Sequence, residues 1–334
     1  MVDSQSERII GLAGQGIFLQ RPRKKGENTR QRTQRPRPQS EVWGRVIDQV
    51  GSPAEGVRYI HVCDRAADNI EVFCHLLQKG CGWVIRASHL TRRVRDVEGA
   101  SRSLDELCQT ATLLGSFQLP LRETATQAAR TATLEVRVSR AWFPRPQRVT
   151  PWLKQTGIRA VGTTILDVRE VSAPAGVTPL RWVLCTDEQV ATLTDAQRII
   201  HYYQQRWLIE EFHKSLKTGC RIESRQYQTR ARLKAVAGLL SVVAVRLVPL
   251  KHAARECPAE PAEVRVPREW LDRLRSLRRR PITTIRDFIR ELAGLGGHLG
   301  RKSDGEPGWI TLWRGLDKLV LALRGCQARK QRCG

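Results

Sequence analysis

The spacing of apolar positions changes several times along this chain, and each change marks an expected element. Residues 57–63 and 82–88 are compact apolar runs that predict buried strands. Residues 41–50 and 65–79 have the wider spacing of helices. From about 91 to 188 short alternating stretches are separated by turns rich in Pro, Gly and Arg, as in a strand-rich region. Strands mixed with helices in this way predict an α/β fold with a β-rich insertion.

The segments around this middle part have different patterns. Residues 7–20 mix β-branched and aromatic residues with glycines and predict a strand or hairpin. Residues 21–40 contain eight basic side chains, one acid and three prolines, so we expect a connector without a core. Whether that connector lies along phosphates or is only solvated stays open. Residues 230–247 predict an apolar helix that packs under the sheet and ends at Pro249.

The end of the chain predicts a separate helical module. A linker with prolines covers residues 257–267, and an amphipathic helix with a basic flank begins near Arg268. Residues 282–295 and 312–323 predict two more helices, with a glycine-rich loop between them.

The stretch from 201 to 217 contains no Gly or Pro and predicts one uninterrupted helix. At about 100° per residue, its functional side chains fall within a single arc roughly 100° wide. They are Tyr203, Arg206, Trp207, Glu210 and Lys217. The apolar side chains Leu208, Ile209, Phe212 and Leu216 fall on the opposite side.

This mixture of groups suits a phosphodiester. Arginine and lysine bind phosphate charge, tyrosine donates to a phosphate oxygen, tryptophan stacks on an unpaired base and glutamate holds a metal ion. Periodicity alone leaves a second interpretation open, in which the charges only make an amphipathic helix soluble.

Composition narrows the choice of partner. The formal net charge is +24 over 334 residues and the pI is about 10.6, which indicates a polyanionic partner, and nucleic acid first. The longest apolar stretch, residues 235–250, is interrupted by Gly238, Arg246 and Pro249, so we expect no membrane span. No secretion signal is apparent. The nine cysteines include no C-x2-C pair, which argues against a zinc ribbon or a disulfide framework.

The spacing Y-x2-R-x3-E-x6-K and the surrounding string RWLIEEFHKSLKTG resemble the signature of bacterial insertion-sequence transposases of the DDE class, in the branch named for Tyr-Arg-Glu-Lys. The resemblance implies an α/β fold with a ribonuclease H-like mixed sheet, a β-rich insertion and a helical C-terminal dimerisation module. We expect the ribonuclease H-like core at residues 1–90 and 191–256. The β-rich insertion is expected at 91–190 and the dimerisation module at 257–334. It also implies that Glu210 is a catalytic metal ligand, and that Tyr203, Arg206, Trp207 and Lys217 bind DNA.

Asp64 follows the first buried strand. On chemistry alone it is either a metal ligand at the end of a strand or the N-cap of the next helix. The string VCDRAAD resembles the family's second catalytic aspartate motif, which implies a catalytic metal ligand 146 residues before Glu210. Carboxylate ligands imply Mg²⁺, with Mn²⁺ as a substitute. We expect Asp68 to be only a charge in the first helical turn.

Two further strings are similar to family segments. TPLRWVLCT is similar to one whose tryptophan stacks on a base flipped out of the DNA end, and Trp182 has that position. A core role for Trp182 is the alternative. LGRKSDGEPGW and the following TLWRG resemble the dimerisation module, which makes Trp309 and Trp313 interface or core anchors and implies a homodimer.

One part of the family pattern is missing from the printed sequence, which contains no Asp-Thr-Thr motif for the first catalytic aspartate. We therefore expect a transposase truncated at its N-terminus, lacking the opening strand of the sheet and inactive alone. The expected partners are terminal inverted repeats and target DNA, in the bacterial cytoplasm with the nucleoid. The alternative is a non-catalytic protein that binds DNA, dimerises and inhibits a full-length transposase.

Overall fold

The computed structural model describes residues 1–18, 26, 38–121, 128–147, 150–301 and 303–333. The chain forms two compact units. Residues 14–206 make up the first, which we call the sheet unit, and residues 1–13 with 207–334 make up the second, the helical unit. Most of the basic connector expected at 21–40 lies outside the described residues.

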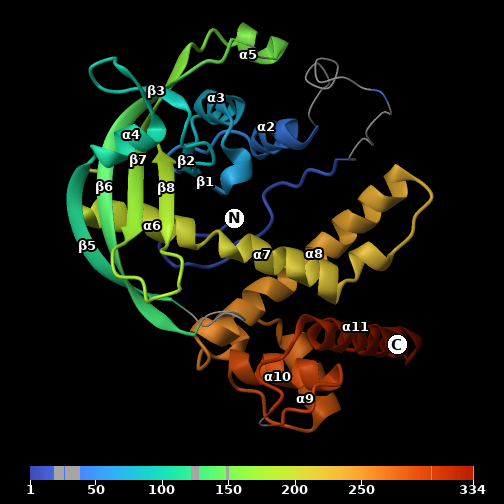
Figure 1. The fold of residues 1–334 in the computed structure, drawn as a ribbon. Coiled ribbons are helices and arrows are strands. Elements are labelled where there is room, and N and C mark those ends of the chain that lie inside the picture. Colours follow the sequence, from blue (N-terminus) through green and yellow to red (C-terminus); the bar gives the residue numbers. More distant parts are fainter. Residues whose placement is uncertain (19–25, 27–37, 122–127, 148–149, 302, 334) are drawn as a thin grey trace. The chain divides into compact units, whose positions relative to one another are not determined.

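The sheet unit is built on one mixed sheet of eight strands (Figure 1). The strands are β1 (Ile60–Cys63), β2 (Gly82–Arg86), β3 (Arg93–Arg95), β4 (Ser101–Ser103), β5 (Thr112–Leu121), β6 (Arg130–Pro144), β7 (Ala160–Glu170) and β8 (Arg181–Thr186). Their order is β1-β2-β8-β7-β6-β3-β4, and β5 pairs with β6. Only β1 and β2 are parallel; the other pairs are antiparallel. Because β8 pairs directly with β2, the strands expected as an insertion continue the sheet that begins at β1.

Helices cover both faces of this sheet (Figure 1). Side chains of α2 (Pro38–Val50), α3 (Ile70–Lys79), α4 (Leu104–Gln109) and α5 (Pro151–Gln155) share one core with the alternate residues Trp83 and Ile85 of β2. On the other face, α6 (Leu193–Gln204) packs Ile199 and Ile200 against Val84 and Leu184. The expected α/β fold is therefore confirmed. Burial on both faces explains why the strands have continuous apolar runs.

Five longer helices make up most of the helical unit: α7 (Trp207–Lys214), α8 (Arg230–Glu256), α9 (Arg268–Arg278), α10 (Ile285–Leu295) and α11 (Trp309–Cys333). They share one core, in which Ile289 and Leu312 are almost fully buried. A Cβ atom built on Gly315 of α11 would lie 1.9 Å from the carbonyl oxygen of Leu292 in α10. Only glycine allows backbones to approach so closely.

Helix α8 differs from the expectation in two ways. It continues through Pro249 to Glu256, and its buried side chains belong to the core of the helical unit. Proline inside a helix costs about 3 kcal/mol. Burial of Leu247, Val248 and Leu250 around it offsets that cost.

Among the described helices, α8 alone is long and apolar enough, by length and composition, to cross a membrane. The interruptions expected at residues 238, 246 and 249 do not break it. Its buried side chains belong to the same core as α10 and α11, as in the core helix of a globular unit.

Several local expectations were wrong. Residues 7–18 form no strand, and the described part of the N-terminal segment has one isolated bridge, between Val2 and Ile9, because glycines weaken strand pairing there. The helix expected at 65–79 is divided into a 3-10 turn, Arg65–Ala67, and α3. The expected linker at 257–267 is partly ordered, since Ala262 and Val266 are buried in the core.

Candidate active site

Asp64 lies directly after β1, at the carboxyl end of the strand. Its Oδ1 accepts a hydrogen bond from the backbone N–H of Ala66, 2.9 Å away, and so caps the 3-10 turn. The side chain is only partly buried. The N-cap interpretation of Asp64 is thus present in the structure. One carboxylate oxygen in a cap leaves the other available, so capping does not exclude a metal-binding role.

The strand register brings Trp182 to the same end of the sheet as Asp64. Cys63 pairs with Ile85 in the parallel ladder, which puts Asp64 at the level of Arg86. Arg86 pairs with Leu184 of the antiparallel strand β8, so Trp182 lies just beyond the carboxyl ends of β1 and β2. The Arg86 side chain also belongs to this end, where its Nη2 donates to the carbonyl oxygen of Arg181 at 2.9 Å.

Helix α6 ends beside these residues. The ring of Tyr203 meets that of Trp182 edge to face, with centroids 5.5 Å apart. The Arg206 guanidinium lies over the Tyr203 ring, 5.9 Å from its centroid. Burial and the charge of Asp64 raise the pKa of the Cys63 thiol to about 12, and Arg206 opposes that rise, which places its charge near the end of β1. The sheet unit therefore gathers Asp64, Trp182, Tyr203 and Arg206.

The single helix expected at 201–217 does not exist. Helix α6 ends at Gln204, where the N–H of Arg206 bonds to the carbonyl of Tyr203 in a tighter i to i+3 pattern. A new helix, α7, begins at Trp207 and passes into a π-helical segment, Ser215–Gly219. Each change of helical period rotates the side chains that follow. As a result Ile209, expected in the core, is 44% exposed. Tyr203, which precedes both changes, is 6% exposed and packs in the core of the sheet unit.

The remaining residues of the expected site belong to the helical unit. Glu210 is exposed in the first turn of α7, where a carboxylate interacts favourably with the helix dipole. Trp207 is partly buried, and its ring meets that of His252 with centroids 5.5 Å apart. Lys217 is exposed, and its ammonium pairs with Glu223 at 2.9 Å.

Asp68 was wrongly expected to be a helix surface charge. Its carboxylate is fully buried, with Oδ2 accepting from the backbone N–H of Ser88 at 2.7 Å and Oδ1 paired with Arg92 at 2.7 Å. Asp68 thus ties the turn after Asp64 to the segment that follows β2. The sequence did mark Asp68 as a candidate functional residue, because it is a second acid four residues after Asp64. Its partners, 20 or more residues away, could not be identified from the sequence.

Comparison with known families identifies two matching regions of the chain. Residues 39–245 match the transposase DDE domain, and residues 242–333 match the Tn5 transposase dimerisation domain. The chain belongs to the DDE transposase family. Its family indicates that this transposase binds DNA, forms homodimers and depends on a divalent metal ion. The helical C-terminal module expected from the sequence is confirmed as a dimerisation domain.

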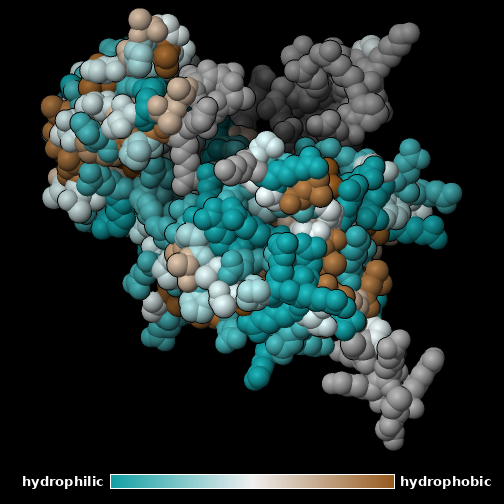
Figure 2. Space-filling model, turned by 90° about the horizontal axis from the view of Figure 1, so that it is seen from below, coloured by the Kyte–Doolittle hydropathy of each residue, from teal (hydrophilic) through white to brown (hydrophobic). Residues whose placement is uncertain are grey.

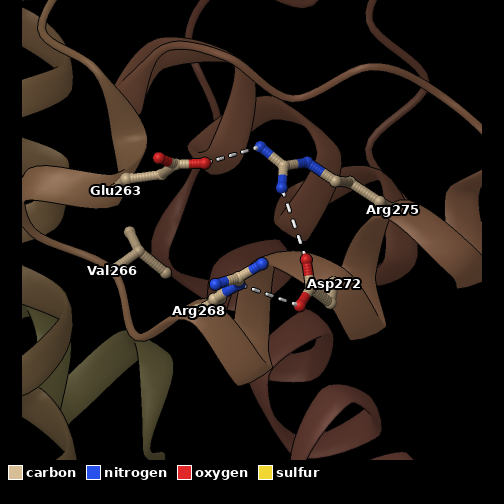
Figure 3. Close-up of a pocket in the computed structure, with 5 residues that line it drawn as sticks. All are labelled: Glu263, Val266, Arg268, Asp272 and Arg275. Atoms are coloured by element: carbon tan, nitrogen blue, oxygen red, sulfur yellow. Dashed lines mark hydrogen bonds and ion pairs between the residues drawn. The ribbon is translucent and has the colours of Figure 1, made fainter.

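The formal net charge of the transposase, +24, suits a polyanion. Hydrophilic side chains cover most of the face shown in Figure 2, with hydrophobic ones in scattered patches. One pocket with charged side chains has no net positive charge, however. In the helical unit a pocket is lined by Val266 and by two acids and two arginines that pair with one another (Figure 3). Arg275 lies 3.6 Å from Glu263 and 3.4 Å from Asp272, so this pocket is not a phosphate site.

The carboxylates of the transposase fit a hard divalent cation by their chemistry. Asp64 and Glu210 both supply oxygen ligands, the type that Mg²⁺ and Mn²⁺ prefer. No group of three or more His, Cys, Asp or Glu side chains gathers among the residues that the structure describes.

Proposed function

We propose that this transposase cuts and joins DNA at the terminal inverted repeats of its own insertion sequence, by a cut-and-paste route and as a homodimer. The grouping of Asp64, Trp182, Tyr203 and Arg206 at one end of the sheet supports this proposal. That end combines a carboxylate, a cation and an aromatic surface, the three kinds of group that strand cleavage beside an unstacked base requires. We place the protein in the bacterial cytoplasm, with the nucleoid.

In this proposal each side chain has a defined part. Arg206 and Lys217 bind backbone phosphates, because guanidinium and ammonium groups form charge-assisted hydrogen bonds with them. Trp182 stacks on a base displaced from the DNA end, and Trp207 contacts a second unstacked base. Tyr203 packs edge to face against Trp182, and its hydroxyl binds a phosphate. Tyr203 is only 6% exposed, so this last role concerns the small part of the side chain that remains accessible.

We propose Asp64 and Glu210 as ligands of Mg²⁺, with Mn²⁺ as a substitute. When bound, such ions activate the attacking oxygen and stabilise the leaving oxygen. The protein contributes the position of each carboxylate. The turn fixed by Asp68 presents Asp64, and the first turn of α7 presents Glu210.

The printed chain offers these two catalytic carboxylates but no Asp-Thr-Thr motif for a third. Two ions close together need three carboxylates to offset their charge and complete their coordination. We therefore propose that this polypeptide binds end DNA but does not cleave it unaided. A second function follows from the match to the dimerisation domain: mixed dimers with an active transposase, which this chain would inhibit.

Binding to end DNA tests the first part. Fluorescence anisotropy with a labelled terminal repeat at several salt concentrations is expected to give a lower salt slope, by about one, for Arg206→Ala, because one phosphate contact is lost. Arg93→Ala is the matched control, since Arg93 is exposed and paired with Glu106 at the other side of the sheet unit. Equal slopes for Arg206→Ala and the unmodified chain would refute the phosphate contact.

Incubation of nicked and intact end DNA with the chain and Mg²⁺ or Mn²⁺ tests the second part. We expect no new strand ends. Cleavage that disappears in Asp64→Ala would contradict the proposed inactivity while supporting Asp64 as a ligand. Titration of the chain into a cleavage reaction of an active transposase from the same insertion sequence then tests the inhibitor function, which predicts loss of cleavage.

A further inference from the structure

Glu211, the neighbour of the proposed metal ligand Glu210, connects α7 to the start of α11. Its Oε2 accepts a hydrogen bond from the indole Nε1 of Trp309, 3.2 Å away. Its Oε1 accepts from the Nζ of Lys214, 3.0 Å away on the same helix. Trp309 is the first residue of α11 and only 6% exposed. A single carboxylate therefore joins two helices that are about 100 residues apart in sequence.

Lys251 of α8 completes this contact. Its ammonium nitrogen lies 4.3 Å from the centroid of the Trp309 ring, in the position of a cation–π interaction. Burial lowers the pKa of Lys251, while the charge of Glu211 opposes that shift. Burial also acts to raise the pKa of Glu211, but the hydrogen bond and charge of Lys214, with the charge of Lys251, hold it below its usual value. Glu211 and Lys251 therefore both contact Trp309, from α7 and from α8.

The backbone of Trp309 also lies close to the π-helical segment that follows α7. A Cβ atom built on Gly219, the last residue of the π-helical segment, would lie 3.5 Å from the carbonyl oxygen of Trp309. The ends of the segment 207–219 are therefore both fixed, by Trp207 against His252 at one end and by Gly219 against α11 at the other. Between them the Glu211 carboxylate is the polar contact with α11.

Simple core packing does not account for this arrangement. Packing requires the Trp309 ring but not its N–H, and an apolar residue at 211 would avoid the cost of partly burying a carboxylate. Successive residues of an α-helix point about 100° apart. Fixing the direction of Glu211 consequently fixes the rotation of α7 about its axis, and with it the direction of Glu210.

We propose that Trp309, Glu211 and Lys251 are positioning residues that hold α7, and through it the Glu210 carboxylate, in register with the dimerisation helix α11. This inference rests on the proposed function for the metal-binding role of Glu210. It adds that the contact connects Glu210 to the region that matches the dimerisation domain, to which α11 belongs.

Hydrogen–deuterium exchange of the full chain tests the contact itself. Trp309→Phe keeps a ring in the core and removes the N–H donor, so exchange of amides 207–214 is expected to rise about tenfold, the value of one hydrogen bond to a charged group. Glu211→Gln keeps an acceptor oxygen but loses the charge, so a smaller rise is expected, and the double variant should exchange no faster than Trp309→Phe alone. Exchange in α10 should not change. Trp313→Phe is the matched control, because it alters the same helix one turn later without touching Glu211.

A second measurement separates the inference from the proposed function. Fe²⁺ added in place of Mg²⁺, with ascorbate and peroxide, cleaves a protein backbone beside the bound metal. The unmodified chain is expected to be cleaved near residues 64 and 210, and Trp309→Phe to lose the cleavage near 210 while keeping that near 64.

The outcomes are distinct. No metal-dependent cleavage in the unmodified chain would refute the metal role of Asp64 and Glu210, and exchange would still decide the Trp309 contact. If Trp309→Phe and Glu211→Gln exchange like Trp313→Phe, the positioning inference is wrong whatever the metal result.

Discussion

The indole ring of Trp182 and the phenol ring of Tyr203 meet at 62° with centroids 5.5 Å apart, joining strand β8 to the last turn of α6. Trp182 is only partly buried, so one part of its ring is held by Tyr203 and another remains accessible. A rigid aromatic surface supported in this way is suited to stack on a base at low entropic cost.

The first prediction concerns this pair. Trp182→Ala is expected to weaken binding of end DNA with an unpaired terminal base by about 5- to 100-fold, because base stacking on an aromatic residue contributes about 1–3 kcal/mol. Trp182→Phe should retain most of the affinity. Anisotropy titrations measure both. Trp152→Ala is the control, since Trp152 stacks on His75 elsewhere in the sheet unit. If Trp182→Ala folds normally and its affinity is unchanged, Trp182 has a packing role only and does not stack on a base.

The second prediction concerns the ion pair between Lys217 and Glu223. The loop that presents Glu223 is preceded by Arg221 in the left-handed region, with φ 52° and ψ 42°. Without DNA, the carboxylate of Glu223 pairs with the ammonium group of Lys217 that would otherwise bind a phosphate. Exposed pairs contribute about 0.2–1 kcal/mol, so Glu223→Gln is expected to tighten DNA binding about two- to fivefold.

A double-mutant cycle checks that the gain acts through Lys217. In a Lys217→Gln background, Glu223→Gln should give only the small gain of any lost negative charge. Glu263→Gln measures that general gain, because Glu263 is another exposed and paired acid of the helical unit. An equal gain in all three comparisons would show that no direct competition exists.

The third prediction concerns Asp68. Removing one partner of a buried ion pair leaves the other charge without compensation, which costs about 3–5 kcal/mol. Asp68→Asn is therefore expected to lower the free energy of unfolding of the sheet unit by about 3 kcal/mol. Urea unfolding followed by circular dichroism gives the value. Asp48→Asn breaks an exposed ion pair in the same unit. It is expected to lower the free energy of unfolding by about 1 kcal/mol or less, the usual contribution of a surface pair.

The fourth prediction compares two glycines of α11. Gly315→Ala places a methyl group against the backbone of α10, and overpacking of this kind costs about 1–3 kcal/mol. At Gly325 a Cβ atom would meet nothing within 4 Å, so Gly325→Ala should gain up to about 1 kcal/mol in helix propensity. Thermal unfolding should therefore shift in opposite directions. A shift in the same direction would mean that α10 and α11 separate easily.

The sequence predicted much of the sheet and part of the site. Strands β1 and β2, and the strand-rich character of residues 91–188, were found because buried strands have apolar or alternating patterns that depend on local sequence. Their partners depend on register, so the pairing of β2 with β8 across nearly 100 residues was not predictable from either strand. The positions of Asp64 and Trp182 relative to each other follow from that register.

The errors in the expected helix at 201–217 have a common cause. A pattern with 3.6 residues per turn assumes one uninterrupted helix, but the chain tightens at Arg206 and widens at Ser215–Gly219. Both changes are set by tertiary packing, which periodicity does not contain. Pro249 is the opposite case, where packing around α8 preserved a helix that local preference would have ended.

The helical unit is discontinuous, because its first 13 residues precede the whole sheet unit. During synthesis the sheet unit emerges from the ribosome complete before most of the helical unit exists. Ile9, which packs on the helical core, must wait until α8 to α11 have been made. Docking of residues 1–13 on the helical core is consequently a late folding step, and nascent chains that have released residue 206 from the ribosome, but not yet α8 to α11, should carry a folded sheet with residues 1–13 still undocked.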